Sequence, residues 1–363
     1  MGIIRLLLAV GVFTSHGGPI LNTLFPNGQV AVEAFFVISG FYMALVLNTK
    51  YPATRTGYFV FLFNRYSRLF PTFISVALLV LVTHLILYGS YKGLEQNSFA
   101  SVILATQSHL FLIGQEAFYF LTYNTQLEFF QLTWNGLSSA ISKSTYLTPG
   151  WHYLLIPQGW TIGVEMLCYI CAPFLARQKI SVLLIFLLVS LTIKLFLHAT
   201  YAEIMLQTTH RSFLPAFPFF LIGLLSYNIF NNVAEKSGKP VCVLFMIFAV
   251  LICIYQPING VGINIFEKNS LKQIAINSYL PIYLFFAIPF IFQITKYSKL
   301  DRFVGDLSYP FYLCHLFIIN RMYFVENYRA EISFLLTIML SVFLVLLIEN
   351  RIDKYRQKLI KAY

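Results

Sequence analysis

The stretch Met1–Gly17, MGIIRLLLAVGVFTSHG, is an apolar segment with Arg5 near its start and His16 near its end. In an α-helix this spacing places both side chains on one face, about 16 Å apart along the axis. An ionisable residue inside a membrane-length helix indicates a functional site by default. The other interpretation is that Arg5 is a positive-inside anchor and His16 an interfacial residue, so the rest of the chain has to decide.

The composition predicts an all-α, polytopic membrane protein. Of the 363 residues, 58% are hydrophobic and only 11% are charged, whereas soluble proteins are about 25% charged. The 25 Lys and Arg exceed the 14 Asp and Glu, but they fall in short gaps between apolar runs, as in loops on the cytoplasmic side. We therefore expect a membrane-lipid environment and no nucleic-acid partner.

Apolar runs of about 17–25 residues predict a bundle of about ten membrane-spanning helices. They lie near 2–20, 29–49, 69–89, 159–175, 180–198, 213–230, 240–256, 274–294, 303–322 and 331–349. We expect one membrane domain over 1–350 and a short basic cytoplasmic tail over 351–363, which acts as a solvated anchor. Lys and Arg concentrate in alternate gaps, which predicts that both termini are cytoplasmic.

The segment 90–158 contains a further apolar run, 99–121, that carries Gln107, His109, Gln115 and Glu116. These polar residues favour a re-entrant or interfacial helix packed against the bundle, and a hairpin crossing is the alternative. The following residues, 124–158, are rich in Thr, Ser, Asn, Trp and Tyr. That composition suits a polar vestibule for carbohydrate, but an interfacial aromatic belt would look the same.

Three charged residues stand out in the first part of the chain. Glu33 lies a few residues inside the second apolar run and on the same side of the membrane as His16, so it is a candidate to orient or polarise His16. The alternative is a Glu33 that sits in the headgroup region. Arg65 and Arg68 precede the third predicted helix, on one face of a helical turn, where they would bind phosphate or serve as topology anchors.

Polar residues also occur inside or at the ends of later apolar runs. Glu165 follows Trp160 in the fourth run, and Arg211 lies at the non-cytoplasmic end of the sixth. The ninth run mixes Tyr309, Tyr312 and His315 into an apolar helix. Cys168 and Cys171 form a CxxC inside a predicted span, where packing is the ordinary explanation and metal or redox use the alternative. Glu349 is expected to cap or pair locally.

An ordered set of motifs resembles the acyltransferase-3 family, integral-membrane acyltransferases of bacterial surface polysaccharides, over nearly the whole chain. The motifs are Arg5 and His16 in the first helix, QVAVEAFFVISGF, RYSRLFP, WTIGVEMLCYICAP, FLIG and SYPFYLCH. The chain departs from the family pattern in two places: Glu33 replaces an Asp, and VAV at 30–32 replaces a Gly-Val. The resemblance leads us to expect the stand-alone form, without a fused hydrolase-like domain.

The resemblance implies that His16 is the catalytic histidine, with Arg5 as its companion, and that Arg65 and Arg68 meet the phosphates of acyl-coenzyme A. We therefore expect an O-acetyltransferase of the bacterial inner membrane that uses acetyl-CoA and no metal, with Glu33 in a catalytic role. The expected acceptor is a sugar hydroxyl of a cell-surface glycan such as O-antigen or exopolysaccharide, or a lipid-linked oligosaccharide. Residues expected to bind it are Trp160, Glu165, Arg211, Tyr309, Tyr312 and His315.

Two questions stay open at this level. His16 could be a general base on the acceptor hydroxyl or a transiently acylated nucleophile. The runner-up function is a non-catalytic transporter or flippase for a lipid-linked glycan, although inverted repeats and paired broken helices are not seen in the sequence.

Overall fold

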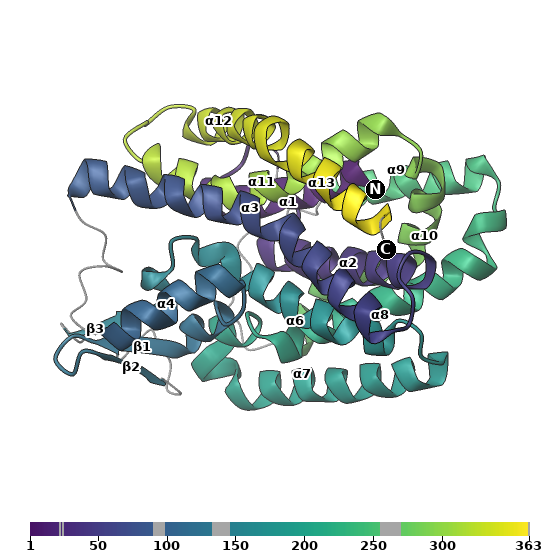
Figure 1. Ribbon diagram of the computed structural model, residues 1–363, viewed down its shortest axis with the longest axis horizontal. Helices are drawn as coiled ribbons and strands as arrows, with labels where there is room; N and C mark the ends of the chain where they lie inside the picture. The colour runs from purple at the N-terminus through teal and green to yellow at the C-terminus, as the bar shows by residue number, and fades with distance from the viewer. Residues whose placement is uncertain (22, 24, 90–98, 133–145, 255–269, 362–363) are drawn as a thin grey trace.

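The computed structural model describes the chain except for residues 22, 24, 90–98, 133–145, 255–269 and 362–363. Within that part the chain is mostly helical (Figure 1). The longer helices are α1 Gly2–Gly17, α2 Gly28–Thr49, α3 Arg55–Tyr88, α4 Phe99–Phe111, α6 Trp160–Leu175, α7 Ile180–Thr209, α8 Phe213–Asn232, α9 Lys239–Ile254, α10 Ser270–Thr295, α11 Lys299–Arg321, α12 Arg329–Leu344 and α13 Asn350–Lys361.

Each of the ten predicted apolar segments lies mainly on a helix; residues 18–20, 89 and 322 lie just beyond helix ends, and 255 and 256 are outside the described residues. Six stretches in the described part are long and apolar enough to cross a membrane. They are Gly28–Thr49, Arg55–Tyr88, Ile180–Leu197, Phe213–Lys236, Ser278–Thr295 and Arg329–Lys358. The helical bundle is thus as expected, whereas the count of ten spans stays a prediction, because α1 and α9 are shorter than a typical span.

Polar side chains define where several helices begin. Asn27 accepts a hydrogen bond from the N–H of Gln29 at the start of α2, and Thr54 accepts one from Gly57 at the start of α3. Such caps satisfy backbone donors that have no partner inside the helix. The cap at Thr54 starts α3 well before the predicted residue 69, so Arg65 and Arg68 lie inside the helix and not ahead of it.

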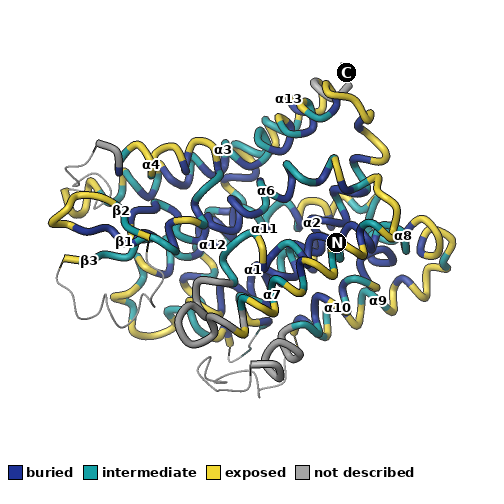
Figure 2. The backbone as a smooth tube through the Cα atoms, turned by 90° about the horizontal axis from the view of Figure 1, so that it is seen from below, coloured by how far each residue is buried: buried dark blue, intermediate teal, exposed yellow. Residues whose placement is uncertain are grey.

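The bundle is built around α1, α2 and α11. Helix α1 packs chiefly on α11, and α2 packs chiefly on α8. In its most apolar part α2 is 78% buried, whereas the corresponding part of α7 is only 11% buried. The change from dark blue inner positions to yellow outer ones is visible from below (Figure 2). The exposed leucines and isoleucines of α7 therefore form a face suited to lipid.

The start of α1 is held by Asp301 at the beginning of α11. The carboxylate of Asp301 accepts hydrogen bonds from the N–H groups of Gly2, at 2.8 Å, and Ile3, at 3.2 Å, and from the amino-terminal ammonium group, at 2.5 Å. A carboxylate at a helix N-terminus satisfies free N–H groups and interacts favourably with the helix dipole. This contact joins the first and ninth predicted helices across almost the whole chain.

The predicted helix over 99–121 is shorter in the structure. Helix α4 ends at Phe111, where Leu112 and Gly114 take positive φ values of 55° and 87°. The thirteen described residues of α4 rise about 20 Å, less than the roughly 30 Å of a bilayer core. The re-entrant or interfacial helix and the hairpin crossing both stay predictions. The backbone N–H of Leu155 donates to the His109 ring at 3.0 Å, which ties α4 to the loop before α6.

A small antiparallel sheet follows α4 and was not predicted. Strand β1 (Leu121–Asn124) lies between β2 (Phe129–Leu132) and β3 (Leu147–Pro149), with the 3-10 turns η1 (Glu116–Phe120), η2 (Gly150–Tyr153) and η3 (Pro157–Gly159) around it. Tyr123, Phe130 and Tyr153 pack on one another with ring centroids 5.1–5.3 Å apart. Part of the predicted vestibule, 133–145, lies outside the described residues. In both views the sheet lies at the left end and the two termini lie to the right (Figures 1 and 2).

Candidate functional site

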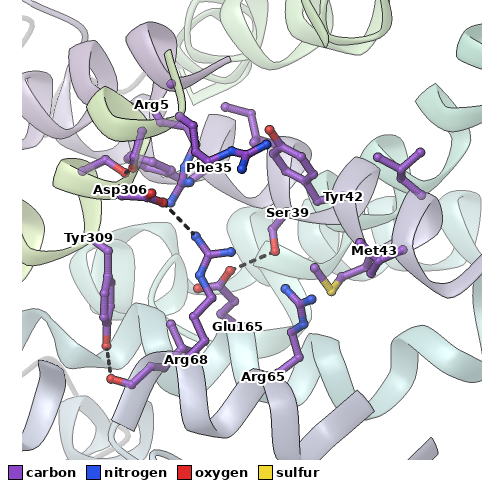
Figure 3. Close-up of a pocket in the computed structure, with 18 of the residues that line it drawn as sticks. Arg5, Phe35, Ser39, Tyr42, Met43, Arg65, Arg68, Glu165, Asp306 and Tyr309 are labelled. Carbon is purple, nitrogen blue, oxygen red and sulfur yellow. Dashed lines mark hydrogen bonds and ion pairs between the residues drawn. The ribbon is translucent and has the colours of Figure 1, made fainter. Parts of the chain in front are cut away.

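A central cavity of about 650 Å³ lies among α1, α2, α3, α6, α10, α11 and α13 (Figure 3). Its mouth is lined by residues at helix ends, including Lys50 after α2, Lys296 after α10 and Arg302 at the start of α11. Its inner end is lined by Thr161 and Tyr312. Because Tyr312 is 13 residues into α11, the cavity extends about 20 Å along that helix.

The cavity is lined by more basic than acidic side chains. Seven basic residues line it, Arg5, Lys50, Arg65, Arg68, Lys296, Arg302 and Arg356, against the five acidic residues Glu165, Asp301, Asp306, Glu349 and Asp353. The excess of two positive charges and the volume, which falls within the usual range for small-molecule sites, suit an anionic ligand of cofactor size.

The three arginines predicted from sequence all line this cavity. Arg65 is 8% exposed, and its Nε has no hydrogen-bond partner in the described part of the chain. Arg68 forms an ion pair with Asp306 at 3.9 Å (Figure 3). Arg5, from α1, enters the same space and makes no hydrogen bond through its guanidinium within the described residues (Figure 3). A buried guanidinium without a full set of partners is costly, so this arrangement favours binding of an anion.

Glu165 lines the same cavity as the arginines. Its carboxylate accepts hydrogen bonds from Ser39, at 2.9 Å, and from the hydroxyl of Tyr169 (Figure 3). The contact joins α6 to α2 through the Ser of the ISGF motif. Tyr309 also lines the cavity and donates its hydroxyl to the carbonyl of Leu69 at 2.8 Å, so it connects α11 to the helix that carries Arg65 and Arg68.

His16 lies just beyond the inner end of the cavity. The Tyr312 hydroxyl donates to the carbonyl of Gln158 at 3.1 Å and accepts from Thr161 at 3.0 Å, and these groups form the inner wall. His16 and His315 are not among the residues that line the cavity. The Tyr312 ring is 5.6 Å from the His315 ring, which is 5.5 Å from the His16 ring. The Tyr312 ring therefore lies between the charged cavity and His315, and His315 faces His16.

The two histidines have different surroundings. His16 is exposed at the end of α1, whereas His315 is fully buried in α11. The Nδ1 of His315 lies 2.6 Å from the carbonyl oxygen of Tyr312. A carbonyl only accepts, so Nδ1 carries the proton and Nε2 is left as an acceptor. That Nε2 is buried and has no partner in the described residues.

The expected contact between Glu33 and His16 is wrong. Glu33 is buried, and in the described part of the chain its carboxylate accepts hydrogen bonds from Lys194 of α7, at 3.0 Å, and from Gln29, at 3.3 Å. The Lys194 ammonium also lies 3.8 Å from the centre of the Phe219 ring. A charge inside a membrane segment needs a partner, and here that partner comes from a helix that the sequence did not link to Glu33.

Trp160 and Arg211 do not line the central cavity and lie around the ring of Tyr119. The guanidinium of Arg211 is 4.4 Å from the centre of the Tyr119 ring, and its charge acts on His16. The Trp160 ring packs 6.5 Å from Tyr119. Burial raises the pKa of Tyr119 to about 12 against the opposing effect of Arg211, so the Tyr119 phenol is neutral and presents a π face to the cation.

Sequence analysis missed three cavity residues and the partner of Glu33. Asp306 and Glu349 lie near helix ends and were not distinguished from ordinary loop or cap residues. Glu349 accepts a hydrogen bond from Thr72 at 3.2 Å, and no local ion pair of Glu349 is seen in the described part of the chain. The prediction of a solvated tail is wrong for Arg356, which is 9% exposed. The partner of Glu33 could have been suspected from the sequence, because Lys194 is a charged residue within a lipid-length apolar run and needs a partner there.

Two of the motif glycines pack against each other where α2 meets α8. A Cβ atom on Gly40 of ISGF would lie 2.1 Å from the carbonyl oxygen of Phe220, and one on Gly223 of FLIG would lie 2.1 Å from that of Val37. Small residues allow helices in membranes to approach this closely. The two motifs therefore serve the same helix contact, which positions Ser39 beside Glu165.

Comparison with known proteins identifies the family. A family model described as an acyltransferase domain matches residues 2–349, nearly the whole chain. Neither the curated proteins nor the solved structures that were compared with the chain match it significantly. With its apolar helices, its charged central cavity and this match, the chain belongs to the acyltransferase-3 family of integral membrane proteins.

Proposed function

We propose that this protein transfers an acyl group, most simply acetyl, from acyl-coenzyme A in the central cavity to a sugar hydroxyl of a cell-surface glycan. The observation that carries the proposal is the arrangement around Tyr312. The cavity is lined by arginines, of which Arg5 and Arg65 form no ion pair in the described residues, and it ends at Tyr312, whose ring lies next to His315, which in turn faces His16. An ion pathway would not require a cationic pocket of this volume that is closed by an aromatic wall.

The donor would lie with its phosphates at Arg65 and Arg68 and its acyl end at Tyr312. Guanidinium groups bind phosphate by charge-assisted, bidentate hydrogen bonds. Helix α1 is continuous over Gly2–Gly17, so Arg5 and His16 are about 16 Å apart along its axis. The pantetheine arm of the donor would cover that length, with Arg5 guiding it inward.

His16 would then act as the base. It takes the proton of the acceptor hydroxyl while the sugar oxygen attacks the thioester carbonyl, the C–S bond breaks, and the coenzyme A thiolate receives the proton from His16. In the nucleophilic variant His16 carries the acyl group between the two steps. Trapping with acid after mixing enzyme and labelled donor alone separates the routes, because only the second leaves label on the protein.

His315, and not Glu33, is suited to orient His16. A hydrogen bond of about 3 Å between ring nitrogens corresponds to ring centres roughly 5 Å apart, close to the 5.5 Å between His16 and His315. The free Nε2 of His315 would accept an N–H from His16 and leave the other His16 nitrogen as the base. Such a partner fixes both the tautomer and the ring orientation of a histidine.

The acceptor would approach His16 from the side that holds Trp160 and Arg211. Aromatic faces with hydrogen-bonding groups beside them suit sugar rings. We further propose that the mouth of the cavity opens to the cytoplasm of the bacterial inner membrane, with both termini on that side. The alternate basic gaps of the sequence support this orientation, as does the presence of Lys50, Lys296 and Arg302 around one mouth.

The test is to incubate purified protein with acetyl-labelled coenzyme A and a bacterial glycan fraction and to measure label on the sugar. We expect transfer by the wild-type protein and none by His16→Ala, with equal insertion of both into the membrane. An active His16→Ala variant would overturn the assignment of His16. A wild-type protein that leaves no label on the glycan would favour the transporter that the sequence left as an alternative.

A further inference from the structure

Helix α13 brings an arginine to the mouth of the central cavity from outside the matched family region. The family model ends at residue 349, whereas Arg356 lies seven residues further on and is buried. Its Nε donates to the Oδ1 of Asn64 at 2.6 Å, and the Nδ2 of Asn64 donates to the Tyr51 hydroxyl at 2.7 Å. The guanidinium is therefore held in a fixed position against α3.

Two other guanidinium groups are near Arg356. The charges of Arg65 and Arg68 both act on it, and all three residues line the cavity. Acidic groups offset part of this charge: Arg68 pairs with Asp306, and Arg356 pairs with Asp353, whose side chain is 51% exposed. Arg65 has no acidic partner within 4.0 Å in the described residues. Like charges held together in this way are stabilised by a bound anion.

We propose that Arg356 and Arg65 form a phosphate site at the mouth of the cavity, so that α13 completes the binding site for the nucleotide part of the donor. Nη2 of Arg356 has no hydrogen-bond partner among the described residues, since Nε is used by Asn64 and Nη1 by Asp353. Buried Arg65 offers its own free Nε. Two guanidiniums with unused donors match the several oxygens of a phosphate. The inference rests on the proposed function because it takes coenzyme A as the anion.

Calorimetric titration of the purified full-length protein with coenzyme A tests the proposal without requiring acyl transfer. Arg356→Met keeps an unbranched stem and removes the charge, and Lys354→Met is the matched control, because Lys354 is exposed on the same helix and does not line the cavity. We expect coenzyme A to bind about tenfold to a hundredfold more weakly to Arg356→Met and unchanged to Lys354→Met. Pantetheine, which has no phosphate, should bind with the same affinity to Arg356→Met and to Lys354→Met.

A third variant separates the phosphate role from the structural one. Arg356→Lys keeps the charge but loses the bond from Nε to Asn64, so it should recover much of the affinity if charge binds the donor. Equal weakening of coenzyme A and pantetheine, or the same affinity in Arg356→Met as in Lys354→Met, would overturn the proposal. If Arg356→Met loses binding of phosphatidylglycerol but binds coenzyme A as before, the anion is a lipid headgroup and the proposal is also overturned. Absence of coenzyme A binding by the wild-type protein would instead refute the proposed function.

Discussion

Replacing Gly40 by Ala tests whether the close contact between α2 and α8 holds the site together. The new Cβ would lie 2.1 Å from the carbonyl oxygen of Phe220, and ordinary contact begins at 3.4 Å. The helices would therefore have to separate by about 1.3 Å, the difference between those two distances. The clashing atom belongs to the backbone, so no side-chain rotation can relieve it.

The expected magnitude follows from two opposing effects. Overpacking of a well-packed interior costs about 1–3 kcal/mol, and a rigid backbone contact falls at the upper end of that range. Alanine is better than glycine in a helix by about 0.5–1 kcal/mol, which offsets part of the loss. We expect Gly40→Ala to lower the free energy of unfolding by about 2 kcal/mol.

The measurement is unfolding in mixed micelles by titration with sodium dodecyl sulfate, followed by circular dichroism. Gly238→Ala is the matched control: its nearest atom would be at 3.7 Å, and we expect a change within about 0.5 kcal/mol. The double variant Gly40→Ala with Gly223→Ala should cost less than the sum of the single changes, because one separation of the helices relieves both clashes. If Gly40→Ala is as stable as the control, the proposed role of the two motif glycines is wrong.

Three further predictions concern the charges and the histidines. Arg68→Gln should raise the KM for the acyl donor about tenfold to a hundredfold and leave the KM for the acceptor unchanged. Arg55→Gln is the control, because Arg55 is an exposed residue of the same helix. If the two variants have the same KM for the donor, Arg68 is only a topology anchor. His315→Leu should lower kcat about a hundredfold without weakening coenzyme A binding. His315→Gln, which keeps a hydrogen-bond donor and an acceptor, should restore part of kcat. If the pH profile of kcat is the same in the wild-type protein and both variants, His315 does not position His16. Burial by itself raises the pKa of Asp301, but hydrogen bonds from the N–H of Gly2, the amino-terminal ammonium group and the N–H of Ile3 lower it by more, so its pKa lies below the ordinary value. Its stabilising contribution should therefore be complete above about pH 4 and be lost as the pH falls through the lower folded value; unfolding measured from pH 6 to pH 3 should show this loss in the wild-type protein and not in Asp301→Asn.

Under the proposed function, Tyr312 has to move during the reaction. Its hydroxyl forms hydrogen bonds with Thr161 and Gln158 that close the inner end of the cavity, and its ring lies next to His315, which faces His16. Under the proposed function, the acyl group would pass this wall to meet the acceptor. The motif SYPFYLCH thus supplies the tyrosine of the wall and, three residues later, the histidine that faces His16, because residues at that spacing share one face of a helix.

The sequence by itself determined the helical bundle, the family and most of the cavity arginines. Long apolar runs can satisfy their backbone groups in lipid only as helices, so the positions of the main helices along the chain could be predicted without a structure. The spacing of Arg5 and His16 was also enough to predict their separation along the helix axis, since a single helix links them and its geometry is regular. Arg65 and Arg68 share a face for the same reason, even though the helix begins earlier than predicted.

The tertiary structure alone decided which charged groups meet. Glu33 pairs with Lys194 and not with His16, and His315 takes the place beside His16. Arg356 folds back to the cavity from a tail that looked like a solvated anchor. These contacts join residues from 161 to 299 positions apart in the chain. Periodicity reports only on neighbours along one helix, whereas the rotation and pairing of helices depend on side-chain packing, such as the contact between Gly40 and Gly223.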